Sequence, residues 1–96
     1  MGASITIYTT DYCPFCHQAK HLLRQKKATF IEIDVGARPD LRSFLRSASG
    51  QTTVPQIFIN GRSVGGFTDI AALDRRGELD RLLAEPPAAD LVAMPT

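Results

Sequence analysis

The chain has 96 residues, of which 44% are hydrophobic and 22% charged, and its 11 basic and 10 acidic side chains give a net charge of +1. This length predicts one domain with a modest core, and the balanced charge disfavours nucleic acid or an anionic membrane as a partner. No apolar run approaches the roughly 20 residues that span a bilayer, and the N-terminus lacks an export signal, so we expect a cytoplasmic protein.

The first predicted strand, residues 4–9, alternates polar and apolar side chains and is rich in β-branched residues. A helix is predicted over residues 18–27, where apolar side chains recur every three or four positions. Pro14 suits the first helical turn, because its missing N–H would have no partner within the helix there. Cys13 and Cys16 therefore lie where the strand gives way to the helix.

This Cys-X-X-Cys pair predicts a redox active site. The thiolate is the form that attacks disulfides, and the free N–H groups and positive dipole at a helix N-terminus favour a negative sulfur. Thiols in such settings have pKa values of roughly 3.5–7.5, against about 8.5 for a free thiol, so we expect Cys13 to be substantially ionised near neutral pH. Cys16, one turn further, is expected to lie nearer the helix interior and to act as the resolving thiol.

The same residues leave other interpretations open. The run Cys13-Pro14-Phe15-Cys16-His17 matches the C-x-x-C-H pattern of covalent haem attachment, which the lack of an export signal disfavours. A zinc site would need four ligands, and the segment offers only this cysteine pair with His17 and His21. A permanent structural disulfide is disfavoured in a reducing cytosol.

The middle of the chain continues the strand and helix pattern. A second strand at residues 30–35 completes a strand-helix-strand unit, which implies a parallel pair. An amphipathic helix follows from Leu41 to Ala48, with Gly50 as its expected C-terminal cap.

A hairpin is predicted next. Pro55 precedes the apolar strand 56–59, at a position suited to a residue that cannot donate to a sheet. Asn60-Gly61 is a strong hairpin signal, and residues 62–65 are expected to return antiparallel.

The last predicted helix is capped by Thr68 or Asp69, is interrupted at Gly77 and reaches residue 83. Residues 1–85 are thus expected to form the domain, and residues 86–96, with three prolines, a flexible tail. The order β-α-β-α-β-β-α predicts an α/β protein with a four-stranded mixed sheet and helices on both faces, the thioredoxin-like fold.

Three separated motifs within residues 4–83 resemble those of the dithiol glutaredoxins. Residues 13–16 (Cys-Pro-Phe-Cys) are similar to the family's Cys-Pro-Tyr-Cys, and residues 53–55 to its Thr-Val-Pro loop. Residues 65–69 (Gly-Gly-Phe-Thr-Asp) resemble its Gly-Gly-x-[Thr/Ser/Asp]-Asp turn. Three such motifs in order at domain spacing are far more specific than one.

The resemblance implies where glutathione binds. Pro55 matches the family's cis-proline, beside which the backbone of Val54 pairs with the cysteinyl part of glutathione. Thr68 and Asp69 match the positions that hold the γ-glutamyl end, where helix N–H groups can donate to a carboxylate and Asp69 can accept from the ammonium. Equally, both residues could merely cap the helix. The other expected contacts are Tyr12, Phe15, Thr53 and Gly66.

The chain departs from the family pattern near the thiol. Thr10 stands where glutaredoxins commonly carry a lysine, Phe15 replaces the usual tyrosine, and Gln51 replaces a frequent basic residue. We expect Arg38 or Arg42 to supply the missing positive charge.

The resemblance implies a glutathione-dependent thiol-disulfide oxidoreductase with glutathione as co-substrate and no metal. Cys13 would be the nucleophile and Cys16 its partner in reducing disulfide-containing or glutathionylated proteins, and the protein would be a monomer. One alternative is an iron–sulfur carrier, in which a dimer shares a cluster between two Cys13 thiolates and two glutathiones. Another is a thioredoxin-like donor that a flavoprotein reductase reduces.

Overall fold

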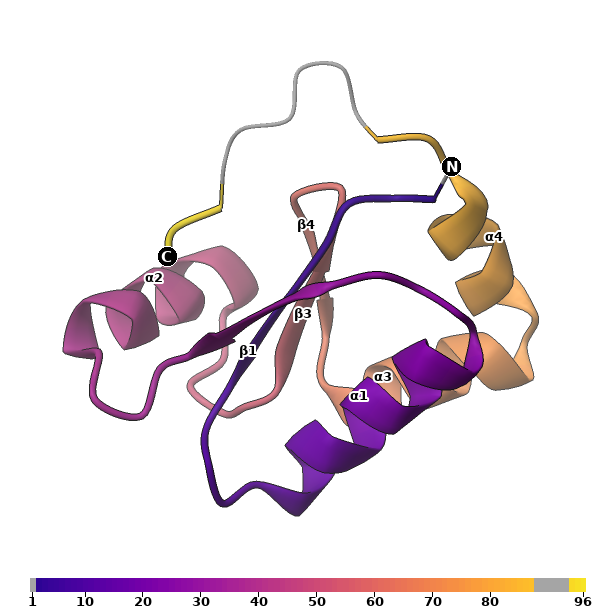
Figure 1. Ribbon diagram of the computed structural model, residues 1–96. Coiled ribbons are helices and arrows are strands. Elements are labelled where there is room, and N and C mark those ends of the chain that lie inside the picture. The colour runs from indigo at the N-terminus through magenta and orange to yellow at the C-terminus, as the bar shows by residue number, and fades with distance from the viewer. Residues whose placement is uncertain (1, 88–93) are drawn as a thin grey trace.

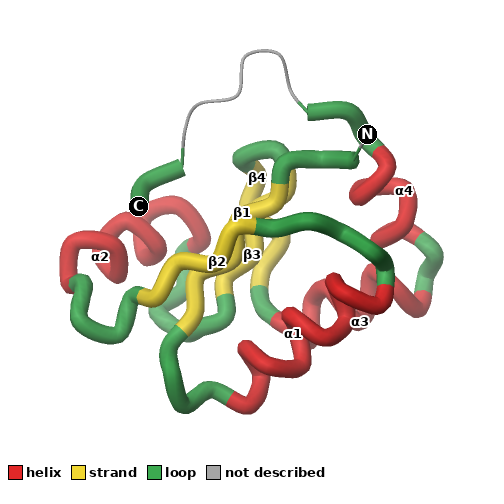
Figure 2. Tube along the Cα trace, in the orientation of Figure 1, coloured by secondary structure: helices red, strands yellow, loops and turns green. Residues whose placement is uncertain are grey.

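A four-stranded sheet lies between helices on its two faces (Figures 1 and 2). The computed structural model describes residues 2–87 and 94–96. Its strands are β1 (Ile5–Thr9), β2 (Ile31–Asp34), β3 (Gln56–Ile59) and β4 (Arg62–Gly65), and its helices are α1 (Pro14–Gln25), α2 (Pro39–Ser49), α3 (Phe67–Arg75) and α4 (Glu78–Ala84). None of these helices combines the length and the apolar character that crossing a membrane requires.

The sheet has the order β2-β1-β3-β4 and is mixed, as predicted. β1 pairs parallel with β2 and antiparallel with β3, and β4 pairs antiparallel with β3. All five residues of the central strand β1 are buried, including Thr6 and Tyr8, because helices cover both faces. The edge strand β2 is largely open, and Ile31 is 61% exposed.

Two cores lie on opposite faces of the sheet. The larger core joins β1 and β3 to α1, α3 and α4; its buried members are Ala3, Ile5, Ile7, Ala19, Leu23, Ile57, Ile59, Ile70 and Leu79. The smaller core lies under α2 and consists of Tyr8, Val35, Leu41, Leu45 and Phe58, with Phe44 and Met94 packed against it. Val54, in the loop before β3, packs against the smaller core.

The last described residues return to the smaller core. The Tyr8 hydroxyl donates a hydrogen bond to the Pro95 carbonyl at 2.7 Å, and burial raises the pKa of Tyr8. Residues 88–93 lie outside the described residues. The flexible tail at 86–96 and the domain limit at residue 85 stay predictions.

The predicted last helix is divided in two. Gly77 adopts φ +74°, a left-handed conformation that few other residues tolerate, and it separates α3 from α4. The predicted cap was wrong, because Gly66 is the cap and α3 begins at Phe67. The Asp69 carboxylate lies one turn in and accepts a hydrogen bond from the Gly66 N–H at 2.9 Å. A side chain can reach back in this way from the third helical position.

Candidate active site

Cys13 lies directly before α1, in the extended conformation of a helix cap (φ −128°, ψ 103°). The proline that follows it fixes the first helical residue without losing a helical hydrogen bond. The Cys16 N–H donates to Cys13 Sγ at 3.1 Å. One amide of the helix N-terminus is thus aimed at the sulfur, as a thiolate requires.

Cys16 lies deeper, with 1% of its surface exposed against 8% for Cys13. Burial, followed by hydrogen bonding to Cys13, raises the pKa of Cys16 to about 12, against smaller opposing effects of the Thr10 backbone and Lys20. Cys16 is therefore a neutral thiol near neutral pH. This places the two sulfurs in the predicted order, with the more accessible one at the helix tip.

The loop before β3 lies against Cys13. Cys13 Sγ donates to the Val54 carbonyl at 3.6 Å, a distance suited to a weak sulfur hydrogen bond. The Val54–Pro55 peptide bond is cis, as predicted. The thiol thus contacts the loop that is predicted to bind glutathione.

A groove of about 730 Å³ extends from this loop to the start of α3. It is lined by Phe15, Gly50, Gln51, Thr52, Thr53, Val54, Pro55, Gly66, Phe67, Thr68 and Asp69. Three segments far apart in the chain thus bring together most of the predicted glutathione contacts. Tyr12 is the exception, because it is 97% exposed and is not part of the lining.

Phe67 is a lining residue that the sequence did not single out. Its ring stacks on Phe15, with centroids 6.4 Å apart and planes inclined by 28°. Its place inside the Gly-Gly-x-Thr-Asp motif was the only available signal, and that motif leaves the residue type open. The two rings form an apolar wall of this groove.

The expected cation is not found in the groove. Of the described residues that line it, none is a lysine or an arginine. Arg38 pairs with Asp40 at 2.8 Å, and Lys20 with Glu32 at 2.8 Å. The structure therefore gives no support to Arg38 or Arg42 as a substitute for the family's lysine.

Gln56, the first residue of β3, is fully buried and is hydrogen-bonded to the loop that precedes the strand. Its Nε2 donates to the Thr53 carbonyl at 3.0 Å and to Gln51 Oε1 at 2.9 Å, while its own Oε1 has no partner among the described residues. Only the nitrogen can face the Thr53 carbonyl, so this contact fixes the orientation of the amide. Gln56 is a positioning residue for the loop.

We expect Gln56→Leu to raise the glutathione KM several-fold while lowering the free energy of unfolding by only about 1 kcal/mol. Leucine keeps the volume but removes both donors, so the Thr53 backbone is no longer held. Steady-state kinetics and urea unfolding measure the two effects. Thr6→Val is the control, since it changes another buried polar side chain of the sheet that lies outside the groove lining. An equal KM in both variants would contradict the role of Gln56.

Residues 2–87 and 94–96 contain no group of three or more histidine, cysteine, aspartate or glutamate side chains placed to hold a metal ion. The zinc interpretation of Cys13, Cys16, His17 and His21 thus has no support in this part of the chain. The chemistry available at the site is that of the two thiols.

Comparison with known proteins adds to this geometry. A family model described as Glutaredoxin matches residues 5–64. The Glutaredoxin of Pseudomonas aeruginosa is 49% identical over 80 residues, covering 83% of this chain and 95% of that protein. Glutaredoxin 3 of Escherichia coli K12 is 47% identical over 81 residues, covering 84% and 98%.

Solved structures agree. The solution structure of glutaredoxin from Brucella melitensis is similar with a TM-score of 0.78 at 47% identity, over 86% of this chain and 90% of that chain. The crystal structure of a buckwheat glutaredoxin–glutathione complex is similar with a TM-score of 0.79 at 28% identity, over 84% and 76%. The predicted thioredoxin-like fold is confirmed. On its sequence, its fold and its paired thiols, the chain belongs to the glutaredoxin family.

Proposed function

We propose that the chain is a glutathione-dependent thiol-disulfide oxidoreductase that reduces glutathionylated proteins and protein disulfides at Cys13. The observation that carries this proposal is the Cys13 sulfur itself. It accepts the Cys16 N–H at 3.1 Å at the tip of α1, and it adjoins a groove large enough for a peptide. We propose that the protein acts in the cytoplasm, where glutathione keeps thiols reduced. We also propose that it is a monomer.

The reaction is thiol-disulfide exchange. The Cys13 thiolate attacks the glutathione sulfur of a mixed disulfide, a Cys13–glutathione bond forms, and the protein leaves as a thiolate that takes up a proton. A second glutathione thiolate then attacks the glutathione sulfur on Cys13, which releases oxidised glutathione and regenerates Cys13. With a protein disulfide, the Cys13 thiolate attacks one substrate sulfur, the substrate S–S bond breaks and the other sulfur leaves as a thiolate. Cys16 then gives up its proton to water and attacks the Cys13 sulfur, which forms the Cys13–Cys16 bridge and releases the second substrate thiolate. Two glutathione thiolates open this bridge in turn and leave as one oxidised glutathione.

Each end of the groove offers a complementary group to glutathione. The Thr53–Pro55 loop presents backbone beside the thiol, and the buckwheat protein of similar fold was solved as a complex with glutathione. At the other end, the first turn of α3 offers N–H groups, and Asp69 offers a carboxylate. We place the glutathione sulfur at Cys13 and its γ-glutamyl end at Thr68 and Asp69.

A coupled assay tests this function. Glutathione, glutathione reductase and NADPH are mixed with a small glutathione mixed disulfide, and NADPH consumption is followed with and without the protein. We expect catalysis that saturates with glutathione. Equal turnover with a thioredoxin-type flavoprotein reductase in place of glutathione would contradict the proposal, and a brown, cluster-bearing protein after anaerobic purification would favour the iron–sulfur carrier.

We expect Gly65→Ala to raise the glutathione KM about tenfold. This is the effect expected when one hydrogen bond to a charged group is lost. Gly65 has φ +94°, and a methyl group there would lie 2.6 Å from Asp69 Cγ, so the carboxylate must move. Steady-state kinetics measure this effect.

Gly77→Ala is the matched control. Gly77 has φ +74°, but nothing lies within 4 Å of an added methyl group, and the residue is not part of the groove lining. Both variants carry the same kind of backbone strain, about 1–3 kcal/mol. Only Gly65→Ala should change KM; the same KM in both variants would remove Asp69 from the glutathione site.

A further inference from the structure

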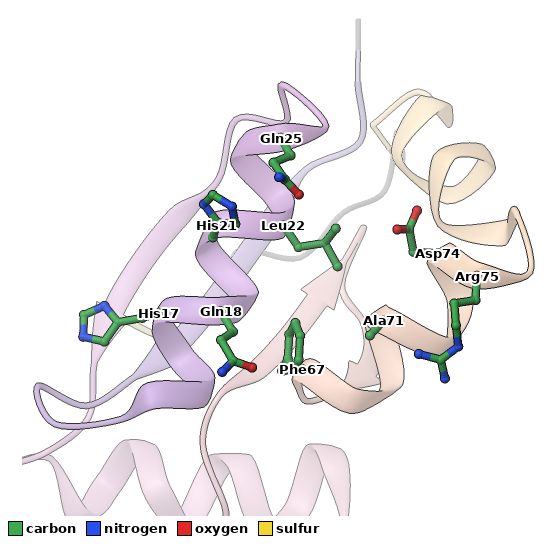
Figure 3. A pocket seen from close by; sticks show the side chains of 9 residues that line it. All are labelled: His17, Gln18, His21, Leu22, Gln25, Phe67, Ala71, Asp74 and Arg75. Carbon is green, nitrogen blue, oxygen red and sulfur yellow. The ribbon is translucent and has the colours of Figure 1, made fainter.

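A second groove, of about 480 Å³, lies between α1 and α3 (Figure 3). It is lined by His17, Gln18, His21, Leu22, Gln25, Phe67, Ala71, Asp74 and Arg75. Leu22 points across the gap toward α3, and Phe67 and Ala71 lie on the opposite wall. The volume is within the range of about 300–1,000 Å³ that is usual for binding sites.

The α1–α3 groove adjoins the groove that begins at the Thr53–Pro55 loop. Phe67 lines both of them, and its other neighbour is Phe15, two residues after Cys13. A chain that leaves Cys13 past the Phe15–Phe67 wall therefore enters the α1–α3 groove. Glutathione, as placed above between Cys13 and Asp69, would occupy the first groove and leave the α1–α3 groove open.

The chemistry of the α1–α3 groove suits an extended peptide. Leu22, Phe67 and Ala71 give it apolar walls, whereas Gln18 and Gln25 place exposed amides along its α1 rim. Neither glutamine makes a side-chain hydrogen bond among the described residues, and Lys26 neutralises Asp74 at 2.6 Å. An apolar recess for a side chain beside free amides for a backbone is the usual composition of a peptide site.

We propose that the α1–α3 groove binds an extended segment of the protein substrate, with an apolar side chain of that segment seated between Leu22, Phe67 and Ala71. The proposal rests on the proposed function. Leu22 follows Cys13 by nine residues, or ~14 Å along the helix at 1.5 Å per residue. An extended chain covers this distance in about four residues at ~3.3 Å each. The favoured substrate thus carries an apolar residue about four positions from its cysteine. Small disulfides lack such a residue, so the groove would favour protein substrates over them.

Two glutathionylated peptides test the proposal. Each has a single cysteine in an otherwise Gly/Ser background; one carries leucine four positions away on both sides, and the other carries serine there. The wild type should process the leucine peptide with a kcat/KM about tenfold higher, which is the lower end of what a buried apolar group contributes to specificity. Equal values for the two peptides in the wild type would overturn the proposal.

Ala71→Trp fills the groove, and Ala48→Trp is its matched control on an exposed position of α2, across the sheet. Ala71→Trp should remove the preference for leucine and leave turnover of a small glutathione mixed disulfide unchanged, while Ala48→Trp should change neither. Retention of the preference in a folded Ala71→Trp variant would overturn the proposal.

Gln25→Ala gives a second test without added volume, and it should lower kcat/KM for both peptides but not for the small disulfide. Loss of small-disulfide turnover in the wild type would instead refute the proposed function.

Discussion

Replacing Cys13 with serine should reduce turnover of both glutathionylated and protein disulfides to the uncatalysed background. A serine hydroxyl is not ionised near neutral pH and does not attack disulfides, and Cys16 cannot take over. Cys16 is 1% exposed, and its pKa is raised to about 12 by burial and by hydrogen bonding to Cys13. Thiolate is the reactive form, so in the reduced protein the protonated and covered Cys16 does not attack a disulfide from solution. It reacts only with a substrate already bonded to the neighbouring Cys13. The coupled glutathione assay with each substrate measures the loss.

The Cys13→Ser protein should remain folded, because an oxygen at this position still accepts the Cys16 N–H at the start of α1. Thermal unfolding close to that of the wild type checks this, together with retained binding of glutathione. Turnover above a few per cent of the wild-type rate in such a folded variant would show that another group is the nucleophile.

Cys16→Ser should separate the two activities. Removal of glutathione from mixed disulfides needs only Cys13 and should continue near the wild-type rate. Reduction of a protein disulfide should fall about 100-fold or more, because a neighbouring thiol in the same molecule acts at a far higher effective concentration than free glutathione. The covalent complex between Cys13 and the substrate should accumulate, and intact-protein mass spectrometry under acid quench measures it.

The same experiment can reject the division of labour between the cysteines. If Cys16→Ser abolished both activities in a protein of unchanged fold, Cys16 would be needed for activating Cys13 and not only for resolving the intermediate. The Cys16 backbone N–H, which bonds Cys13 Sγ at 3.1 Å, is kept in this variant, so loss of the amide contact would not explain such a result.

The sequence predicted the hairpin better than it predicted burial. Strands β3 and β4 have the predicted bounds, because Asn60 and Gly61 both adopt the positive φ that a tight hairpin turn requires. The alternation in residues 4–9 indicated a strand with one polar face, yet β1 is buried throughout. Covering both faces depends on where α2 and α1 pack, which is a tertiary property that local periodicity does not carry.

At the site, the motifs singled out Thr53, Thr68 and Asp69, which lie in the groove lining, but not Gln56 and Phe67. Thr53, Thr68 and Asp69 could be predicted because their residue types match a family pattern. The role of Gln56 could not, since a polar residue at the start of an apolar strand gives no sign of which carbonyl it will meet. Phe67 was hidden for a related reason: its importance comes from Phe15, which lies 52 positions earlier in the chain and joins it only in the fold.

The hydrogen bond from the Cys13 sulfur to the Val54 carbonyl has a consequence for timing. A sulfur can donate only while it holds its proton, so the carbonyl has this partner in the thiol form of Cys13 and loses it in the thiolate form. At that moment the loop gains a free acceptor within reach of the reacting atom. The backbone N–H of an incoming cysteine can then donate to the Val54 carbonyl. Deprotonation of Cys13 therefore both forms the nucleophile and frees the acceptor that binds the substrate backbone.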